Sequence, residues 1–222
     1  MGVAALALGA SACAHRERAN TATPQPTDWS GVYPTTLQPP HTFGPDFVLQ
    51  QQVSIAYSGQ QRSFEAVIQK TGDRLVVLGL APHGGRGFAL TQKGVEVHFQ
   101  RFVPERLPFP PRFILYDVFR TWFYRAPPGT IERDGERVTT IVDDAGAIVE
   151  RRFVRLDGER PGAIVVRYEG GLAPGAPDSA PPPAEVTFDN GWFGYRSTIR
   201  TLRWQPLAGA ATNAPTNAPA PR

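Results

Sequence analysis

Residues 64–80 read Phe-Glu-Ala-Val-Ile-Gln-Lys-Thr-Gly-Asp-Arg-Leu-Val-Val-Leu-Gly-Leu, and this stretch decides the fold. Apolar and β-branched residues dominate both ends, and Gly72 with Asp73 marks a turn between them. Two such runs joined by a tight turn predict an antiparallel hairpin. Further short runs of strand character flank this hairpin, at residues 52–57, 86–91 and 95–102. About five strands linked by tight turns indicate a meander.

Strand character returns in the second half of the chain, at residues 137–142, 148–154, 163–168, 185–189 and 195–204. About ten strands and one interrupting helix predict a mainly β fold of the α+β type. We expect a strongly curved antiparallel sheet that forms an unclosed β-barrel, with one or more helices covering its concave face.

The predicted helix is the segment 112–124, which follows a proline cluster and precedes Pro127. Prolines at these places are typical of helix start and stop signals. The polar residues share one helical face, and they are Asp117, Arg120, Thr121 and Tyr124. The rest of the segment is apolar and must lie against other apolar surface. We expect Asp117 and Arg120, three positions apart, to form a surface ion pair.

The only cysteine, Cys13, follows a short apolar run that begins at Gly2. This run has the length of a signal-peptide core and is too short to span a membrane. Small residues before Cys13 make the site similar to a lipobox, in which the cysteine is acylated. Ala14 and His15, rather than Asp, follow it, so we expect an anchor on the periplasmic face of a Gram-negative outer membrane. The alternative is a disposable signal peptide with an incidental cysteine.

Composition divides the 222 residues into four parts. Residues 1–13 form the predicted signal peptide, and the polar, Pro-rich residues 14–44 form a tether and entry segment. Residues 45–206 form the folded domain. Residues 207–222, with a repeated Thr-Asn-Ala-Pro, are predicted to be a disordered tail.

The charge pattern and the histidines argue against several function classes. The net charge is only +3, and the basic residues are scattered among acidic ones, so we expect no nucleic-acid partner. The four histidines, His15, His41, His83 and His98, lack the spacing of metal ligands. The sequence has no nucleophile elbow and no phosphate loop. We therefore expect no metal, no cofactor and no enzyme activity; the alternative is an active site assembled from distant residues.

Four stretches, residues 64–86, 107–123, 183–190 and 195–202, occur in an order and spacing that resemble the LolA/LolB superfamily. LolB is the outer-membrane lipoprotein that receives lipoproteins from the carrier LolA. The chain resembles most the LolB-like lipoproteins whose domain has no assigned function and whose genes often accompany aryl-polyene synthesis. The resemblance covers roughly residues 45–205.

The resemblance implies an unclosed barrel whose apolar cavity holds acyl chains under helices. Burying an acyl chain gains about 0.8 kcal/mol per methylene, so such a cavity needs no catalytic group. The candidate lining residues are Val53, Ile55, Val97, Phe99, Phe119, Trp122 and Phe123; the alternative is that they form a packed core. In LolB a leucine at the turn matching 81–85 inserts into the membrane, whereas this chain has His83 there. The resemblance therefore supports lipid or lipoprotein binding rather than the transfer step.

These observations lead to a first hypothesis of a lipid-anchored envelope protein that binds an acyl chain or an acylated ligand, with a LolA-like periplasmic carrier as a possible partner. A second hypothesis is a structural or assembly lipoprotein that binds another envelope protein. A third is an enzyme accessory to lipid or polyene synthesis, which requires polar groups converging in the cavity.

Overall fold

The computed structural model describes residues 23–24, 33–81, 84–104, 110–177 and 179–207. Cys13 and His83 lie outside these ranges, so the predicted acylation site and turn tip stay predictions. Twelve described strands form one antiparallel sheet in the order β1-β6-β5-β4-β3-β2-β12-β11-β10-β9-β8-β7. The strands are β1 (Thr23–Pro24), β2 (Phe47–Tyr57), β3 (Gln60–Thr71), β4 (Arg74–Leu80), β5 (Arg86–Lys93), β6 (Glu96–Arg101), β7 (Gly129–Arg133), β8 (Glu136–Val142), β9 (Ile148–Arg155), β10 (Ile164–Leu172), β11 (Glu185–Asn190) and β12 (Tyr195–Pro206).

Tight turns of two residues set the register of the hairpins. Ser58 and Gly59, with φ of 50° and 74°, join β2 to β3. Asp134 and Gly135, with φ of 50° and 75°, join β7 to β8. Two successive positive φ angles match the twist of the flanking strands, and Gly accepts them without a Cβ clash. Alternating burial along β4 and β11 shows that one face of each strand is turned to the core.

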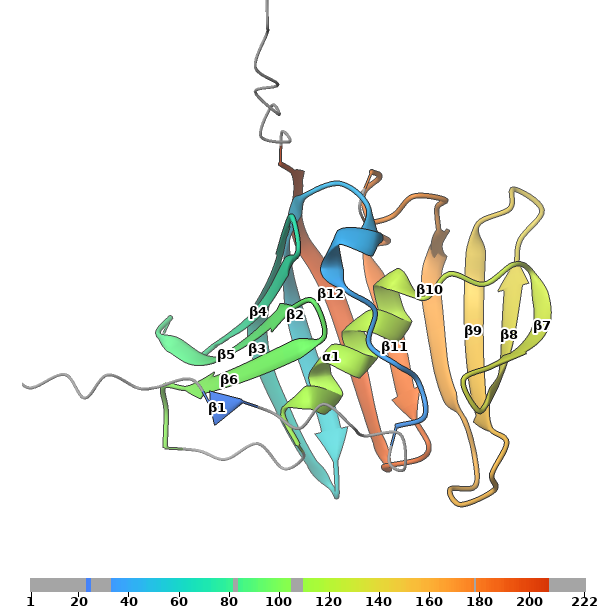
Figure 1. Cartoon of the computed structure of the whole chain (residues 1–222), viewed down its shortest axis with the longest axis horizontal. Helices are drawn as coiled ribbons and strands as arrows, with labels where there is room; N and C mark the ends of the chain where they lie inside the picture. The colour runs from blue at the N-terminus through green and yellow to red at the C-terminus, as the bar shows by residue number, and fades with distance from the viewer. Residues whose placement is uncertain (1–22, 25–32, 82–83, 105–109, 178, 208–222) are drawn as a thin grey trace, which may run out of the picture.

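The sheet consists of two meanders, β2–β6 and β7–β12, joined where β2 pairs with β12. β6 is next to the end strand β1, and β7 is the strand at the opposite end, so the connection from β6 to β7 must cross the sheet. The helix α1 (Arg112–Val118) and the π-helical turn η2 (Phe119–Phe123) make this crossing. In Figure 1 the curved sheet lies behind and to both sides of α1. The predicted fold, an unclosed curved antiparallel sheet with a helix over its concave face, is confirmed.

The core fills the space between the helix and the concave face. Trp122 and Phe123 from η2 are 1% and 3% exposed; Phe123 lies against Phe47 of β2 and Trp122 against Tyr168 of β10, with ring centroids 6.0 and 6.4 Å apart. Phe43, from the 3₁₀ turn η1 (Pro40–Phe43), stacks on Phe123 with 4.1 Å between ring centroids. Tyr33 and Leu37 are also buried. The folded domain therefore begins before residue 45, because part of the predicted tether and entry segment contributes to the core.

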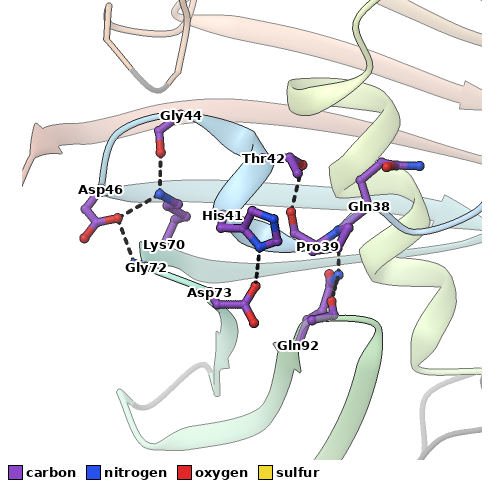
Figure 2. Close-up of polar contacts among 11 residues, drawn as sticks. Gln38, Pro39, His41, Thr42, Gly44, Asp46, Lys70, Gly72, Asp73 and Gln92 are labelled. Atoms are coloured by element: carbon purple, nitrogen blue, oxygen red, sulfur yellow. Dashed lines mark hydrogen bonds and ion pairs between the residues drawn. The ribbon is translucent and has the colours of Figure 1, made fainter.

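Polar contacts fasten residues 38–46 to the first meander (Figure 2). The ammonium group of Lys70, a residue 4% exposed, donates hydrogen bonds to the Gly44 carbonyl and, over 2.8 Å, to Asp46 Oδ1. The hydrogen bond from Lys70 lowers the pKa of Asp46 below its usual value. Nearby, Gln92 Nε2 donates to the Gln38 carbonyl over 2.8 Å. These contacts hold the N-terminal segment across the ends of β3, β4 and β5.

Candidate functional site: the concave face

The structure separates the seven predicted lining residues into two groups. Val97, Phe119, Trp122 and Phe123 are 1–7% exposed and belong to the packed core. Val53, Ile55 and Phe99 are half-buried, each on a strand of the sheet. A ligand role for any of the seven stays a prediction. The half-buried group shows where the concave face still presents apolar surface.

Strand pairing extends this half-buried group into a strip. Val53 on β2 lies opposite Phe64 on β3 and Ile199 on β12, so the three side chains share a face. Phe64 contacts Phe88, and Phe88 contacts Phe99, with ring centroids 6.1 and 6.4 Å apart. The concave apolar strip is defined here as Val53, Ile55, Phe64, Phe99 and Ile199, all half-buried.

The apolar surface continues across β4 because Gly79 on that strand has no side chain. Gly79 lies opposite Ala66 on β3 and Phe88 on β5. A Cβ at Gly79 would overlap the Phe88 ring, so the ring occupies the space that a side chain would fill. Phe88 thereby bridges the rings of Phe64 and Phe99. Sequence reasoning missed Phe64 and Ile199, because their place beside Val53 depends on the registers of β2 with β3 and β12.

The polar face of the helix is not the surface feature that was expected. Arg120 is fully buried and pairs with the fully buried Glu136 of β8, and Glu136 also accepts a hydrogen bond from Thr35 over 2.8 Å. The guanidinium of Arg120 lies 4.4 Å from the ring centroid of Tyr33. The predicted surface pair of Asp117 with Arg120 is therefore wrong, since the helix turns this face toward β8 and the N-terminal segment.

Asp117 instead accepts hydrogen bonds from two phenols. The hydroxyls of Tyr33 and Tyr195 donate to its two carboxylate oxygens. Asn190 Nδ2 donates to the same hydroxyls, over 2.8 Å to Tyr33 and 2.9 Å to Tyr195. Desolvation by burial raises the pKa of Asp117 to about 7, despite the opposing hydrogen bonds. Burial, followed by the charge of Asp117, raises the pKa of both tyrosines well above 10.

This polar cluster of Asp117, Tyr33, Tyr195 and Asn190 joins the helix to the N-terminal segment and to β11–β12. Its polar groups satisfy one another, as buried polar groups in folded proteins generally do. These hydrogen bonds fix α1 over the concave face. Within the described residues, no three His, Cys, Asp or Glu side chains converge as a metal site would require. None of the described helices is long and apolar enough to cross a membrane.

Three solved structures are similar to this one. A LolA superfamily protein from Nitrosomonas europaea is 12% identical, with a TM-score of 0.43, covering 74% of this chain and 87% of its own. A domain described as an outer membrane lipoprotein-sorting protein, from Vibrio parahaemolyticus, is 11% identical, with a TM-score of 0.45 and coverages of 77% and 88%. A DUF1329 family protein from Desulfovibrio piger is 13% identical, with a TM-score of 0.34 and coverages of 75% and 87%.

No curated protein matches the sequence. One family model does, and it matches residues 48–203, which run from the start of β2 almost to the end of β12. The matched range contains the whole concave apolar strip and the helix that crosses the sheet. The chain therefore belongs to the family described as protein of unknown function DUF3261.

Proposed function

We propose that this protein is a lipid-anchored envelope protein that binds the acyl chain of a lipid or lipoprotein on its concave apolar strip. The observation that supports the proposal is the strip itself. Three of its members, Val53, Phe64 and Ile199, are cross-strand neighbours, and the rings of Phe64, Phe88 and Phe99 continue the apolar surface across β5 and β6. Contiguous exposed apolar surface on a soluble domain marks an interaction site.

The energetics favour an acyl chain as the occupant. Each buried methylene contributes about 0.8 kcal/mol, so about eight methylenes contribute roughly 6 kcal/mol before ordering costs. The strip supplies aliphatic and aromatic groups, which need no fixed geometry to accept such a chain. Asn190 is hydrogen-bonded to Tyr33 and Tyr195, and Glu136 is paired with Arg120, so these two buried polar groups do not compete for the ligand. The proposed activity is therefore binding of the acyl chain.

The location in the cell envelope is part of the same proposal. Cys13 would carry the lipid anchor at the periplasmic face of the outer membrane, and a LolA-like carrier would be the source of an acylated ligand. His83, in place of the leucine of LolB, argues for holding a ligand rather than inserting it into the membrane. Labelling of cells with an alkyne fatty acid tests the anchor: Cys13→Ser should abolish incorporation.

Ligand binding is tested with the Cys13→Ser chain and a fluorescent fatty acid. Ile55→Gln places an amide in the strip and should weaken binding about tenfold, because apolar contact is replaced by a polar group. Ile141→Gln is the matched control: Ile141 is 46% exposed on β8, outside the strip. Native mass spectrometry of the purified protein should show bound lipid. Equal affinities of both variants and the parent would remove the strip from the binding site.

The second candidate is a structural lipoprotein that binds another envelope protein. The dense packing beneath the helix favours it, because Phe119, Trp122 and Phe123 fill the concave face there with the protein's own side chains. This candidate predicts an empty protein in native mass spectrometry and no saturable binding of the fatty acid.

A further inference from the structure

A second feature lies where the chain leaves η2 and approaches β9. An open depression of about 270 Å³ is lined by Arg125, Ala126, Pro127, Ile148 and Arg151. Three of these residues follow η2, and the other two belong to β9. None of them belongs to the concave apolar strip.

Arg151 is one of two buried arginines, with Arg112, for which no ion pair is found within the described residues, and only Arg151 lines the depression. Arg151 is 1% exposed, yet no carboxylate of the described residues forms an ion pair with it. Its Nη1 donates to the Tyr168 hydroxyl over 2.9 Å and to the carbonyls of Arg120 and Thr121 over 3.4 and 3.3 Å. These carbonyls belong to the helical segment, so one side of the guanidinium caps it, and cations are favourable near such carbonyls.

The other edge of the guanidinium, formed by Nε and Nη2, does not donate to these carbonyls. Arg151 Nε is enclosed without a hydrogen-bond partner, and no hydrogen bond of Nη2 is found within the described residues. The neighbour across β8 and β9, Thr140, has an enclosed hydroxyl that is also unpartnered. A buried donor without an acceptor costs free energy, and two adjacent ones mark a place where an acceptor belongs.

Elsewhere in this protein the same guanidinium edge holds carboxylates. Nε and Nη2 of Arg155 both donate to Asp157, and those of Arg137 both donate to Glu132. Nε and Nη2 of Arg196 likewise both donate to Asp189. Two parallel N–H groups match the oxygens of a carboxylate or a phosphate.

We propose that the depression at Arg151 is a binding site for an anionic headgroup, a carboxylate or a phosphate carried by a ligand with an apolar part. The Nη2 group of Arg151, which has no hydrogen-bond partner among the described residues, donates to the anion, and Nε lies beside it on the same edge. Ala126, Pro127 and Ile148 contact the apolar part, and the volume accommodates a headgroup with a few methylenes. The site uses residues separate from the strip, so it does not depend on acyl binding there.

The test follows the Nε–Hε resonance of Arg151 in ¹⁵N-labelled full chain, assigned by its loss in Arg151→Lys. Hexanoate and inorganic phosphate are titrated at matched ionic strength, with 1-hexanol as the uncharged analogue. The expected result is a saturable shift by an anion, with a dissociation constant of about 1 mM or lower, and no shift by 1-hexanol. Tighter hexanoate binding identifies a carboxylate on an alkyl chain; equal or tighter phosphate binding identifies a phosphate.

Two variants at the depression wall keep Arg151 in place. Ala126→Glu brings a competing carboxylate and should weaken anion binding at least tenfold, whereas Ala126→Gln, of similar size, should leave the affinity nearly unchanged. The proposal is overturned if neither anion shifts the resonance, if 1-hexanol shifts it equally, or if the Glu and Gln variants bind alike. Ile55→Gln should not alter any of these titrations, which separates this site from the proposed acyl site.

Discussion

The hydroxyl of Tyr33 donates a hydrogen bond to Oδ1 of Asp117 over 2.5 Å, across 84 positions of sequence. Tyr33 is fully buried, and Asp117 lies on the helix that covers the concave face. The pKa of Asp117 is raised to about 7, first of all by desolvation, so this carboxyl group takes up a proton in the neutral range. The contact between the N-terminal segment and the helix is therefore sensitive to pH.

The raised pKa of Asp117 predicts that stability falls as pH rises from 5 to 7. In this window the folded protein holds a proton at Asp117 that the unfolded chain, with a pKa near 4, has released. The slope should approach but not exceed about 1.4 kcal/mol per pH unit and flatten above pH 7. Urea denaturation at several pH values measures it. Asp117→Asn should reduce this slope. The histidines are common to both proteins, so their contribution cancels when the two stability curves are subtracted. Parallel curves of stability against pH would refute the assignment to Asp117.

The buried pair of Arg120 and Glu136 predicts a large cost when one charge is removed. Glu136→Gln should lower the free energy of unfolding by about 3–5 kcal/mol, because Arg120 is left buried without a counter-charge. Replacing both residues, with Arg120→Met and Glu136→Leu, should recover much of this loss. Denaturant midpoints of the parent protein and of these two variants test the prediction.

The same hairpin supplies the control for that prediction. Arg137 pairs with Glu132 over 2.8 Å, with side chains 54% and 55% exposed. Glu132→Gln should change stability by less than about 1 kcal/mol, because water screens this pair. A similar cost for the two glutamate variants would mean that burial does not set the strength of the Arg120 pair.

The absence of a side chain at Gly79 predicts a steric effect. Gly79→Ala places a Cβ against the ring of Phe88 and should destabilise the protein by about 1–3 kcal/mol. It should also weaken fatty-acid binding, because the displaced ring interrupts the strip. Gly85→Ala, where no atom lies within 4 Å of the added Cβ, is the control. Combining Gly79→Ala with Phe88→Ala should remove the clash, and the two single costs should not add.

The pairing of Asp46 with Lys70 predicts the opposite response to acid. The pKa of Asp46 is lowered by the hydrogen bond from Lys70, so its contribution is present at neutral pH and is lost as pH falls below about 4. Asp46→Asn should cost about 1 kcal/mol at pH 7 and progressively less toward pH 3. Thermal unfolding of the parent and of Asp46→Asn across this pH range measures the difference in stability. A difference that does not change with pH would contradict the role of the Asp46 charge.

Local patterns predicted ten of the twelve described strands and the helical segment; β1 and β7 (Gly129–Arg133) were missed, and β7 has a single apolar residue, Ile131. The hairpin at residues 64–80 follows from apolar runs around Gly72, and the helix follows from the spacing between the prolines. The polar face of the helix was misjudged because its partners are distant in sequence. Arg120 finds Glu136 on β8, and Asp117 finds Tyr33 and Tyr195. A polar helical face looks the same in sequence whether it meets water or a buried counter-charge.

The candidate site was only partly accessible from sequence for a related reason. Alternation assigns Val53 and Ile55 to one face of β2 but does not identify the neighbouring strand. The pairing of Val53 with Ile199 joins segments near the two ends of the domain. Phe64 and Ile199 therefore entered the strip only once register was known. Arg151 was not predicted as a site residue. Its importance lies in having no carboxylate partner, and the sequence does not show which side chains lie near it.

The central pairing of β2 with β12 determines the order in which the protein can fold. Each meander is built from contacts between adjacent hairpins, which form early because the intervening loops are short. The pairing from Phe47↔Pro206 to Tyr57↔Tyr195 closes a loop of nearly the whole domain. Ribosomal synthesis delivers β12 last, so until then the first meander exposes β2 as an open edge. That edge is the point at which an unfinished chain is vulnerable to aggregation and at which a chaperone would be needed.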